Sequence, residues 1–217
     1  FELRPLPAAE STPAAPVASA STSLLGFEPA LALDGNPQTA WRAPARAPRP
    51  TISLDFQALR EYGGLTLHWQ PGRHATDYVV ENSENGTEWS VARQVHGANG
   101  GRDDLYLPES EAHFVRLRIV RAASAAGIGL AEIVVRPLAW SASRNTFFQA
   151  IATDAPRGFY PRAIVGEQPY WTVVGVDDDT REALLDEDGR LETGIGRFAI
   201  EPFLFTAGHL VTWHDVE

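Results

Sequence analysis

Short runs in which every second residue is apolar constrain this chain more than any other feature. The clearest are "TISLDF" (51–56), "GLTLHW" (64–69) and "HFVRLRIV" (113–120), followed by "LAEIVV" (130–135). A period of two sends alternate side chains to opposite faces of a β-strand, so each run predicts a strand with one buried face. We expect about seven such strands between residues 17 and 140, a number and spacing typical of a β-sandwich.

A hairpin is predicted by "DYVVENSENGTEWSVARQV" (77–95). Two β-rich runs flank Asn85-Gly86, the pair best suited to the positive φ angles of a tight hairpin turn. We expect Trp89, at the start of the second run, to point inward.

The charge balance excludes several classes of partner. Lysine plus arginine number 18 against 28 aspartates and glutamates, for a net charge of -10, which disfavours nucleic acids and anionic lipid surfaces. No apolar run approaches the roughly 20 residues of a membrane-spanning helix. Cysteine is absent, so disulfides, thiolate metal sites and a cysteine nucleophile are excluded.

The chain divides into three predicted parts. Residues 1–16 are rich in proline and alanine and are expected to be a linker. The chain begins with Phe1, which suggests a processed or trimmed start and an exported protein, secreted, periplasmic or on the cell surface. Residues 17–140 are the predicted sandwich. Residues 141–217 are a β-rich segment of an incomplete second domain, expected to be part of a larger β-sandwich.

The stretch "ALDGNPQTAW" (32–41) offers Asp34, Asn36 and Thr39 as oxygen donors on one loop. Oxygen ligands on a tight loop that contains glycine suit calcium. Asp-Gly-Asn-Pro is also an ordinary turn sequence, so these residues alone leave both interpretations open.

The order of the motifs is more specific than any one of them. "SASTS", "ALALDGNPQTAW", "TISLDF", "LTLHW", "DYVVENSENGTEW", "HFVRLRIV" and "GLAEIVV" follow one another along residues 17–138. This succession resembles the discoidin-type domain, also called the coagulation factor 5/8 type C domain, which includes many carbohydrate-binding modules of secreted bacterial glycosidases. The resemblance implies an all-β, galactose-binding-like jelly-roll sandwich.

In the sugar-binding members of that family, the matching loop and a late Ala-Glu pair hold a structural calcium ion. The resemblance therefore implies calcium as a structural cofactor, and it implies a set of ligands. These are the carbonyls of Leu31, Asn36 and Ala131, the side chains of Asp34 and Thr39, and the carboxylate of Glu132. Trp41, which follows the loop, is expected in the core.

A sugar site is expected on the loops at one end of the sandwich, where planar polar groups meet hydroxyls. The predicted ligand-binding residues are Arg42, Arg73, His74, Asn99, Arg102 and Tyr106. These loops hold few aromatic residues on which a sugar ring could stack.

Three functions remain open at this point. The first is a non-catalytic, calcium-stabilised carbohydrate-binding module of a larger secreted polysaccharide-processing protein, whose partners are a glycan and its own C-terminal domain. The second is a structural or protein-interaction sandwich that binds no sugar. The third is a fragment of a glycoside hydrolase that contributes to its active-site rim, with Glu167 and Glu201 as the carboxylates to test. Residues 145–217 resemble a β-sandwich that precedes an α/α-barrel glycosidase module, so the chain alone is predicted to be inactive.

Overall fold

The computed structural model describes residues 14–154, 162–166, 190–193, 196–201 and 212–215. Its first part holds seven strands: β1 (Val17–Ala20), β2 (Trp41–Ala43), β3 (Thr51–Trp69), β4 (Ala75–Ser83), β5 (Ser90–Val95), β6 (Arg102–Ala122) and β7 (Ile128–Arg136). A short 3-10 helix, η1 (Pro29–Ala32), lies between β1 and β2. The alternating runs therefore form strands, as predicted.

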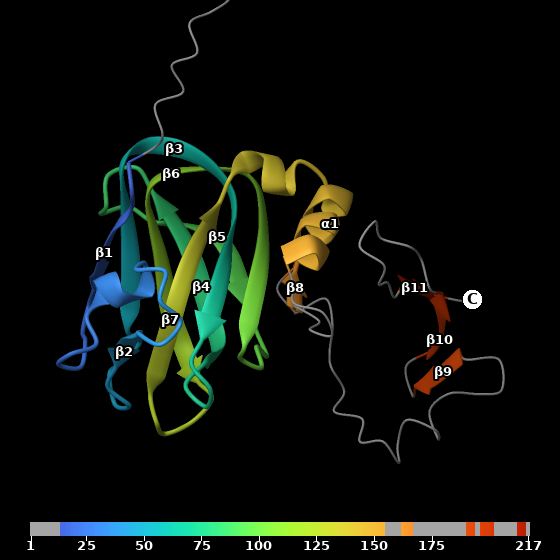
Figure 1. Ribbon diagram of the computed structural model, residues 1–217, viewed down its shortest axis with the longest axis horizontal. Helices are drawn as coiled ribbons and strands as arrows, with labels where there is room; N and C mark the ends of the chain where they lie inside the picture. The colour runs from blue at the N-terminus through green and yellow to red at the C-terminus, as the bar shows by residue number, and fades with distance from the viewer. Residues whose placement is uncertain (1–13, 155–161, 167–189, 194–195, 202–211, 216–217) are drawn as a thin grey trace, which may run out of the picture.

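Two long strands connect the two layers of the sandwich (Figure 1). The first part of β3 pairs with β1 and with the end of β6, which continues the layer through β4 and β5. The last part of β3 pairs with the start of β6 and with β7, and β7 pairs with β2. Antiparallel pairing throughout this part confirms the predicted all-β sandwich.

The sequence predicted two strands, 51–56 and 64–69, where the structure has the single strand β3. The bends of β3 and β6 explain this difference. The β3–β6 register shifts between Asp55 and Arg60 and again between Tyr62 and Gly64. Gln57 and Glu109 adopt positive φ angles of 63° and 56° near these shifts. Bulges of this kind bend a strand sharply, and here they carry it from one layer to the other.

The core fills the space between the layers with the apolar residues of the alternating runs. Trp41 is fully buried, as predicted, and its Nε1 donates to the carbonyl of Thr22 at 3.1 Å. The largest fully buried side chains include Trp41, Tyr62, Tyr78, Phe56 and Ile52.

The β4–β5 hairpin differs from the prediction in its turn. Gly86 has the expected positive φ of 74°, but the connection spans residues 84–89 and is organised by the Asn85 side chain, which accepts the N–H groups of Thr87 and Glu88. Trp89 precedes β5 and is half-buried, with the Arg116 guanidinium 3.9 Å above its ring. The expectation that Trp89 points into the core is therefore wrong.

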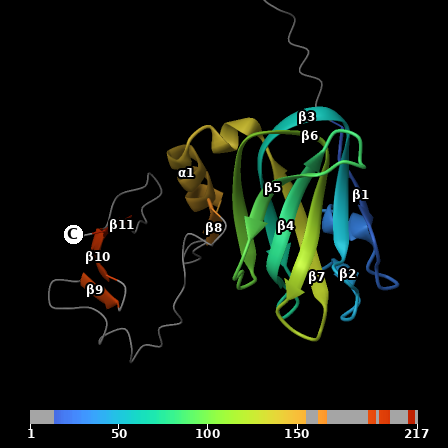
Figure 2. The same cartoon turned by 180° about the vertical axis from the view of Figure 1, so that it is seen from behind.

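A helix not expected from the sequence follows the sandwich. After η2 (Leu138–Ser141), Ser143 accepts the backbone N–H of Thr146 at 3.0 Å and so caps α1 (Arg144–Asp154). Phe147 and Ile151, one turn apart, are buried against Trp140 and Ala163. Ala163 belongs to β8 (Arg162–Ile164), which pairs with β6 in parallel, and Figures 1 and 2 both show α1 and β8 beside β6.

The last described strands form a sheet of their own. β9 (Arg190–Thr193), β10 (Gly196–Glu201) and β11 (Thr212–Asp215) pair antiparallel in the order β11, β10, β9. Glu167 lies outside the described residues.

Candidate functional site

The strand directions gather five connections at one end of the sandwich, the lower end in Figure 1. They are residues 21–28, 44–50, 70–74, 96–101 and 123–127. We call these residues, together with Arg42 of β2, the loop end.

Hydrogen bonds join two of these connections, 70–74 and 123–127, to Arg42 and to the start of β7. The Nε of Arg42 donates to Oε1 of Gln70 at 2.6 Å, and the Gln70 N–H donates to the Gly129 carbonyl at 2.9 Å. Nη1 of Arg73 donates to the carbonyl of Ala126. The Gly129 N–H in turn donates to the Arg73 carbonyl at 2.8 Å. Arg42, Gln70 and Arg73 therefore form one polar group.

Two glycines allow this close approach. A Cβ on Gly129 would lie 2.5 Å from Oε1 of Gln70. A Cβ on Gly127, whose φ is +82°, would lie 2.7 Å from the carbonyl oxygen of Ala43. A side chain at Gly127 would meet backbone and separate the loops, whereas one at Gly129 would meet the flexible end of Gln70 and displace it.

An apolar turn stands beside Arg42. The Arg42 guanidinium lies 4.0 Å from the centroid of the half-buried Phe27 ring. Phe27 closes a turn with Leu24 in which Gly26 has a φ of 80°, and Leu25 at its tip is 96% exposed.

Sequence reasoning missed Leu25 and Gln70. Only the position of Gln70, directly after the alternating run that ends at Trp69, could have drawn attention to it.

His74 and Asn99 belong to the same end. A Cβ on Gly100 would lie 2.6 Å from Nδ1 of His74, so the 96–101 connection passes directly over this ring. Asn99 is exposed on that connection. The structure thus brings Arg42, Arg73, His74 and Asn99 to one end of the molecule.

Arg102 and Tyr106 lie elsewhere, because β6 begins at Arg102 where the sequence suggested a loop. Arg102 is 8% exposed, and its Nη2 donates to Oδ1 of Asp104 at 3.0 Å. The Tyr106 ring packs 5.3 Å from the ring of Phe147 in α1. Both side chains contribute to the face that α1 and β8 cover.

Ion pairs link that face to the end of α1. Nη1 of Arg136 lies 2.9 Å from Oδ2 of Asp154, and Nε of Arg136 donates to Oγ1 of Thr66. Thr66 donates in turn to the fully buried carboxylate of Asp104 at 2.7 Å. Burial raises the pKa of Asp104, against the lowering effect of Arg102. We call this group, with Arg102, the paired network.

The side chains predicted as metal ligands lie together where the connection between η1 and β2 meets β7. Oγ1 of Thr39 is 2.8 Å from Oδ2 of Asp34 and 2.8 Å from the Asn36 carbonyl. Gly35, which follows Asp34, donates its N–H to Oε2 of Glu132 at 3.0 Å. Asp34, Asn36, Thr39 and Glu132 are thereby brought together.

The two residues whose backbone carbonyls are expected to bind the metal, Leu31 and Ala131, lie in elements that adjoin these side chains. Leu31 lies in η1, which contacts β7. Ala131 sits at a β-bulge: its neighbours Leu130 and Glu132 pair with Trp69 and His68, while Ala131 has no partner in either adjoining strand. A bulge releases the backbone of its extra residue from the ladder.

The donor chemistry of this cluster fits a hard cation. Thr39 has one hydroxyl proton, yet both Asp34 oxygens and the Asn36 carbonyl lie within 2.9 Å of its oxygen. Burial raises the pKa of Glu132, and the charge of Asp34 raises it further. No group of three or more His, Asp or Glu side chains suited to a metal occurs in the described residues, so most ligands here would be neutral oxygens, as calcium accepts.

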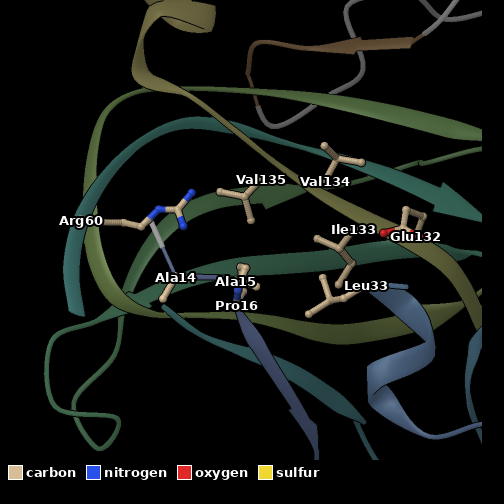
Figure 3. A pocket seen from close by; sticks show the side chains of 9 residues that line it. All are labelled: Ala14, Ala15, Pro16, Leu33, Arg60, Glu132, Ile133, Val134 and Val135. Atoms are coloured by element: carbon tan, nitrogen blue, oxygen red, sulfur yellow. The ribbon is translucent and has the colours of Figure 1, made fainter. Parts of the chain in front are cut away.

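An open groove of about 320 Å³ adjoins this cluster (Figure 3). It lies between the chain that leads into β1 and the strand β7. Its lining is largely apolar, with Arg60 and Glu132 as the polar side chains. These two give a sugar few hydroxyl partners, so we place no glycan there.

The sequence also matches a family model. The model of the F5/8 type C domain matches residues 17–133, which include every residue of the loop end. The chain belongs to the F5/8 type C family. The predicted resemblance is confirmed.

Solved structures of carbohydrate-binding modules share this F5/8 type C fold. Chitosan-binding module 2 of a chitosanase/glucanase from Paenibacillus sp. IK-5, solved with chitotriose, is 25% identical, with 57% of this chain and 98% of that module covered and a TM-score of 0.54. The family 32 module of NanJ from C. perfringens, solved with galactose, is 16% identical, with 55% and 92% covered and a TM-score of 0.51. No curated protein matches the chain. Among the described residues, every helix is too short or too polar to cross a bilayer.

Proposed function

We propose that this F5/8 type C domain is a non-catalytic carbohydrate-binding module that holds its glycan at the loop end. The observation that carries the proposal is the convergence of Arg42, Gln70 and Arg73 at the start of β7, on a fold shared with solved carbohydrate-binding modules. Planar polar groups fixed by neighbouring backbone suit the hydroxyls of a sugar.

The neighbouring residues supply the rest of such a site. His74 and Asn99 extend the polar surface across two further connections. Leu25 and Phe27 offer apolar contact for the C–H face of a sugar ring, in place of a broad aromatic platform. Arg102 and Tyr106 are left out of the proposed surface because their side chains serve the face under α1.

The proposal includes calcium as a structural ion held by Asp34, Asn36, Thr39 and Glu132, with the carbonyls of Leu31 and Ala131. The crowding of oxygen atoms around one hydroxyl proton supports it. Bound there, the ion would tie the loop after η1 to β7 and would take no part in the glycan contacts.

We further propose that the domain works within a larger secreted protein that processes polysaccharides. Chitosan-binding module 2 comes from a chitosanase/glucanase, which supports this setting. The module would hold the parent protein on its polymer, and its second partner would be the C-terminal part of its own chain.

A second candidate function rests on a different surface. α1 and β8 pack on β6 through an apolar cluster and the paired network, so the sandwich also serves as a support for the chain that follows it. In a purely structural module this would be the whole role, and the loop end would bind no sugar.

The experiment that separates these functions is a glycan-array screen of the whole chain, followed by calorimetry on each hit. A Gln70→Ala variant tests the site, and Gln149→Ala, an exposed position on α1, is its matched control. We expect saturable binding without hydrolysis, weakened by Gln70→Ala and unchanged by Gln149→Ala. Absence of binding to every glycan would leave the structural role alone, and turnover of a glycan would revive the hydrolase hypothesis.

A further inference from the structure

The loop end has a charge opposite to that of the whole molecule. Its charged residues are Arg42, Arg46, Arg49 and Arg73 against Glu28, whereas the complete chain carries a net charge of -10. An excess of positive charge on one surface of a negatively charged protein attracts anionic ligands to that surface.

The arginines of the loop end are also not neutralised by the protein. Elsewhere in the described residues, five arginines form ion pairs with aspartate or glutamate: Arg102, Arg116, Arg118, Arg121 and Arg136. Within the described part of the chain, no carboxylate lies within ion-pair distance of Arg42, Arg46, Arg49 or Arg73.

The groups that hold these arginines in place are neutral. Arg42 is fixed by the Gln70 amide oxygen and the Phe27 ring, and Arg73 by the Ala126 carbonyl. Neutral partners orient a guanidinium while leaving its charge and its other N–H donors available. Arg42 and Arg73, both beside Gly129 at the start of β7 and both held by neutral groups, form a preorganised site for an anion.

The 44–50 connection adds two exposed charges to this site. Arg46 follows Ala45, whose backbone would lie 2.9 Å from a Cβ on Gly127. Arg49 stands between two prolines with a positive φ of 45°, a conformation that a non-glycine residue adopts at a cost in free energy. Both arginines are exposed.

We propose that the loop end selects acidic glycans, meaning sugars that carry a carboxylate or a sulfate. Guanidinium groups pair with such oxyanions through two parallel hydrogen bonds, which are stronger than bonds to neutral hydroxyls. A cationic amino sugar would be repelled, so the ligand class differs from that of the chitosan-binding module to which the chain is similar. The inference rests on the proposed binding of a glycan at this end.

The test uses polymers that differ only in charge. Calorimetry with the whole chain compares polygalacturonate with its methyl ester, dextran sulfate with dextran, and both pairs with chitosan oligosaccharide. We expect an acidic polymer to bind about tenfold or more tightly than its neutral counterpart. Raising the ionic strength from about 0.05 M to about 0.3 M should weaken this binding, because salt screens exposed charges. The carboxylate and sulfate arms identify which oxyanion is recognised.

Charge-removing variants assign the binding to the site. The double variant Arg42→Gln/Arg73→Gln should lose about tenfold or more in affinity for the acidic polymer, and Arg46→Gln a smaller factor. Arg144→Gln removes an exposed arginine at the start of α1 and should change nothing. Thermal melts of all variants exclude loss of folding.

The two proposals fail in different ways. Equal binding of neutral and acidic polymers, reduced by the double variant, would overturn the preference for acidic glycans and keep the proposed function. Tighter binding of chitosan would also overturn it. No binding to any of these polymers or to a glycan array would overturn both, as would binding to phosphatidylserine vesicles in place of glycans.

Discussion

The arginines of the loop end and those of the paired network show two uses of one side chain. Arg102 and Arg136 meet Asp104 and Asp154 beneath α1, and Arg102 is 8% exposed. Arg42 and Arg73 meet an amide and a carbonyl at the edge of the molecule. A buried arginine needs a carboxylate to offset its desolvation, whereas one at the surface can remain unpaired. The difference suggests that the first pair serves folding and the second serves binding.

The proposed calcium site, formed by Asp34, Asn36, Thr39 and Glu132, repeats this contrast with the opposite sign. The carboxylates of Asp104 and Asp154 have arginine partners, whereas Asp34 and Glu132 lie near each other with none among the described residues. Unpaired positive charge at one place and unpaired negative charge at another favour an anionic and a cationic ligand respectively.

The largest expected effect is on the paired network. Arg102→Met should lower the free energy of unfolding by about 3 to 5 kcal/mol at neutral pH, because it leaves the buried Asp104 carboxylate without its main partner. Glycan affinity should stay the same. Urea unfolding and calorimetry measure the two quantities.

The pH dependence of Arg102→Met follows from the raised pKa of Asp104. Below that raised pKa the folded state binds a proton that the unfolded state binds only near pH 4, so stability increases as the pH falls through the folded pKa. Loss of Arg102 removes its lowering effect and raises the pKa of Asp104 further, so the variant takes up this proton at a higher pH than the wild type. The cost of Arg102→Met should therefore shrink as the pH falls through the raised pKa of the variant. Adding Asp104→Asn should recover stability at pH 7. A cost independent of pH would mean that the lost packing of Arg102, and not the stranded charge, causes the effect.

The sequence predicted the fold better than it predicted these roles. Period-two alternation located the strands, because a strand with one buried face alternates apolar and polar residues along the sequence. It could not show that β3 and β6 bend between layers, since that depends on register shifts set by long-range pairing. For the same reason Arg102 was placed on a loop, while it belongs to a strand whose outer face α1 covers.

The composition of the loops predicted part of the proposed glycan site. Loop composition pointed to Arg42, Arg73, His74 and Asn99, which the structure brings to one end, but not to Gln70, whose proposed role depends on its contact with Arg42 on another strand. The helix α1 was missed because its apolar positions, Phe147 and Ile151, gain meaning only from Trp140 and Ala163. Which arginines are paired is likewise a property of the tertiary structure.

A glycine of β3 tests how rigid the covered face is. In Gly64→Ala the new Cβ would lie 2.2 Å from the Leu105 carbonyl and 2.5 Å from the Trp140 ring. Neither can move without disturbing β3–β6 pairing or α1, so we expect a loss of about 3 kcal/mol in urea unfolding. Gly166→Ala, with no atom within 4 Å of the new Cβ, is the control and should have little effect. Similar stabilities of the two variants would mean that α1 is held loosely.

At the proposed calcium site, calcium at 100 times its dissociation constant should raise the free energy of unfolding by about 2.7 kcal/mol. The melting temperature should rise on adding calcium and fall with a chelator. Asp34→Asn and Glu132→Gln should abolish this shift, whereas Glu61→Gln, an exposed carboxylate on β3, should retain it. A calcium shift that survives both ligand changes would place the ion elsewhere.

The smallest expected effect on stability belongs to Gly129→Ala, and it separates the two regions most directly. The new Cβ would lie 2.5 Å from Oε1 of Gln70, the far end of a flexible side chain that can turn away. Stability should therefore change by less than about 1 kcal/mol. Turning Gln70 away, however, removes the acceptor that holds the Arg42 guanidinium, so glycan affinity should fall about tenfold. Gly64→Ala should give the reverse, a loss of stability with affinity retained in the folded fraction. If Gly129→Ala instead destabilised the fold and left affinity intact, Gln70 would be a structural residue, and the arginines of the loop end would not depend on it for their orientation.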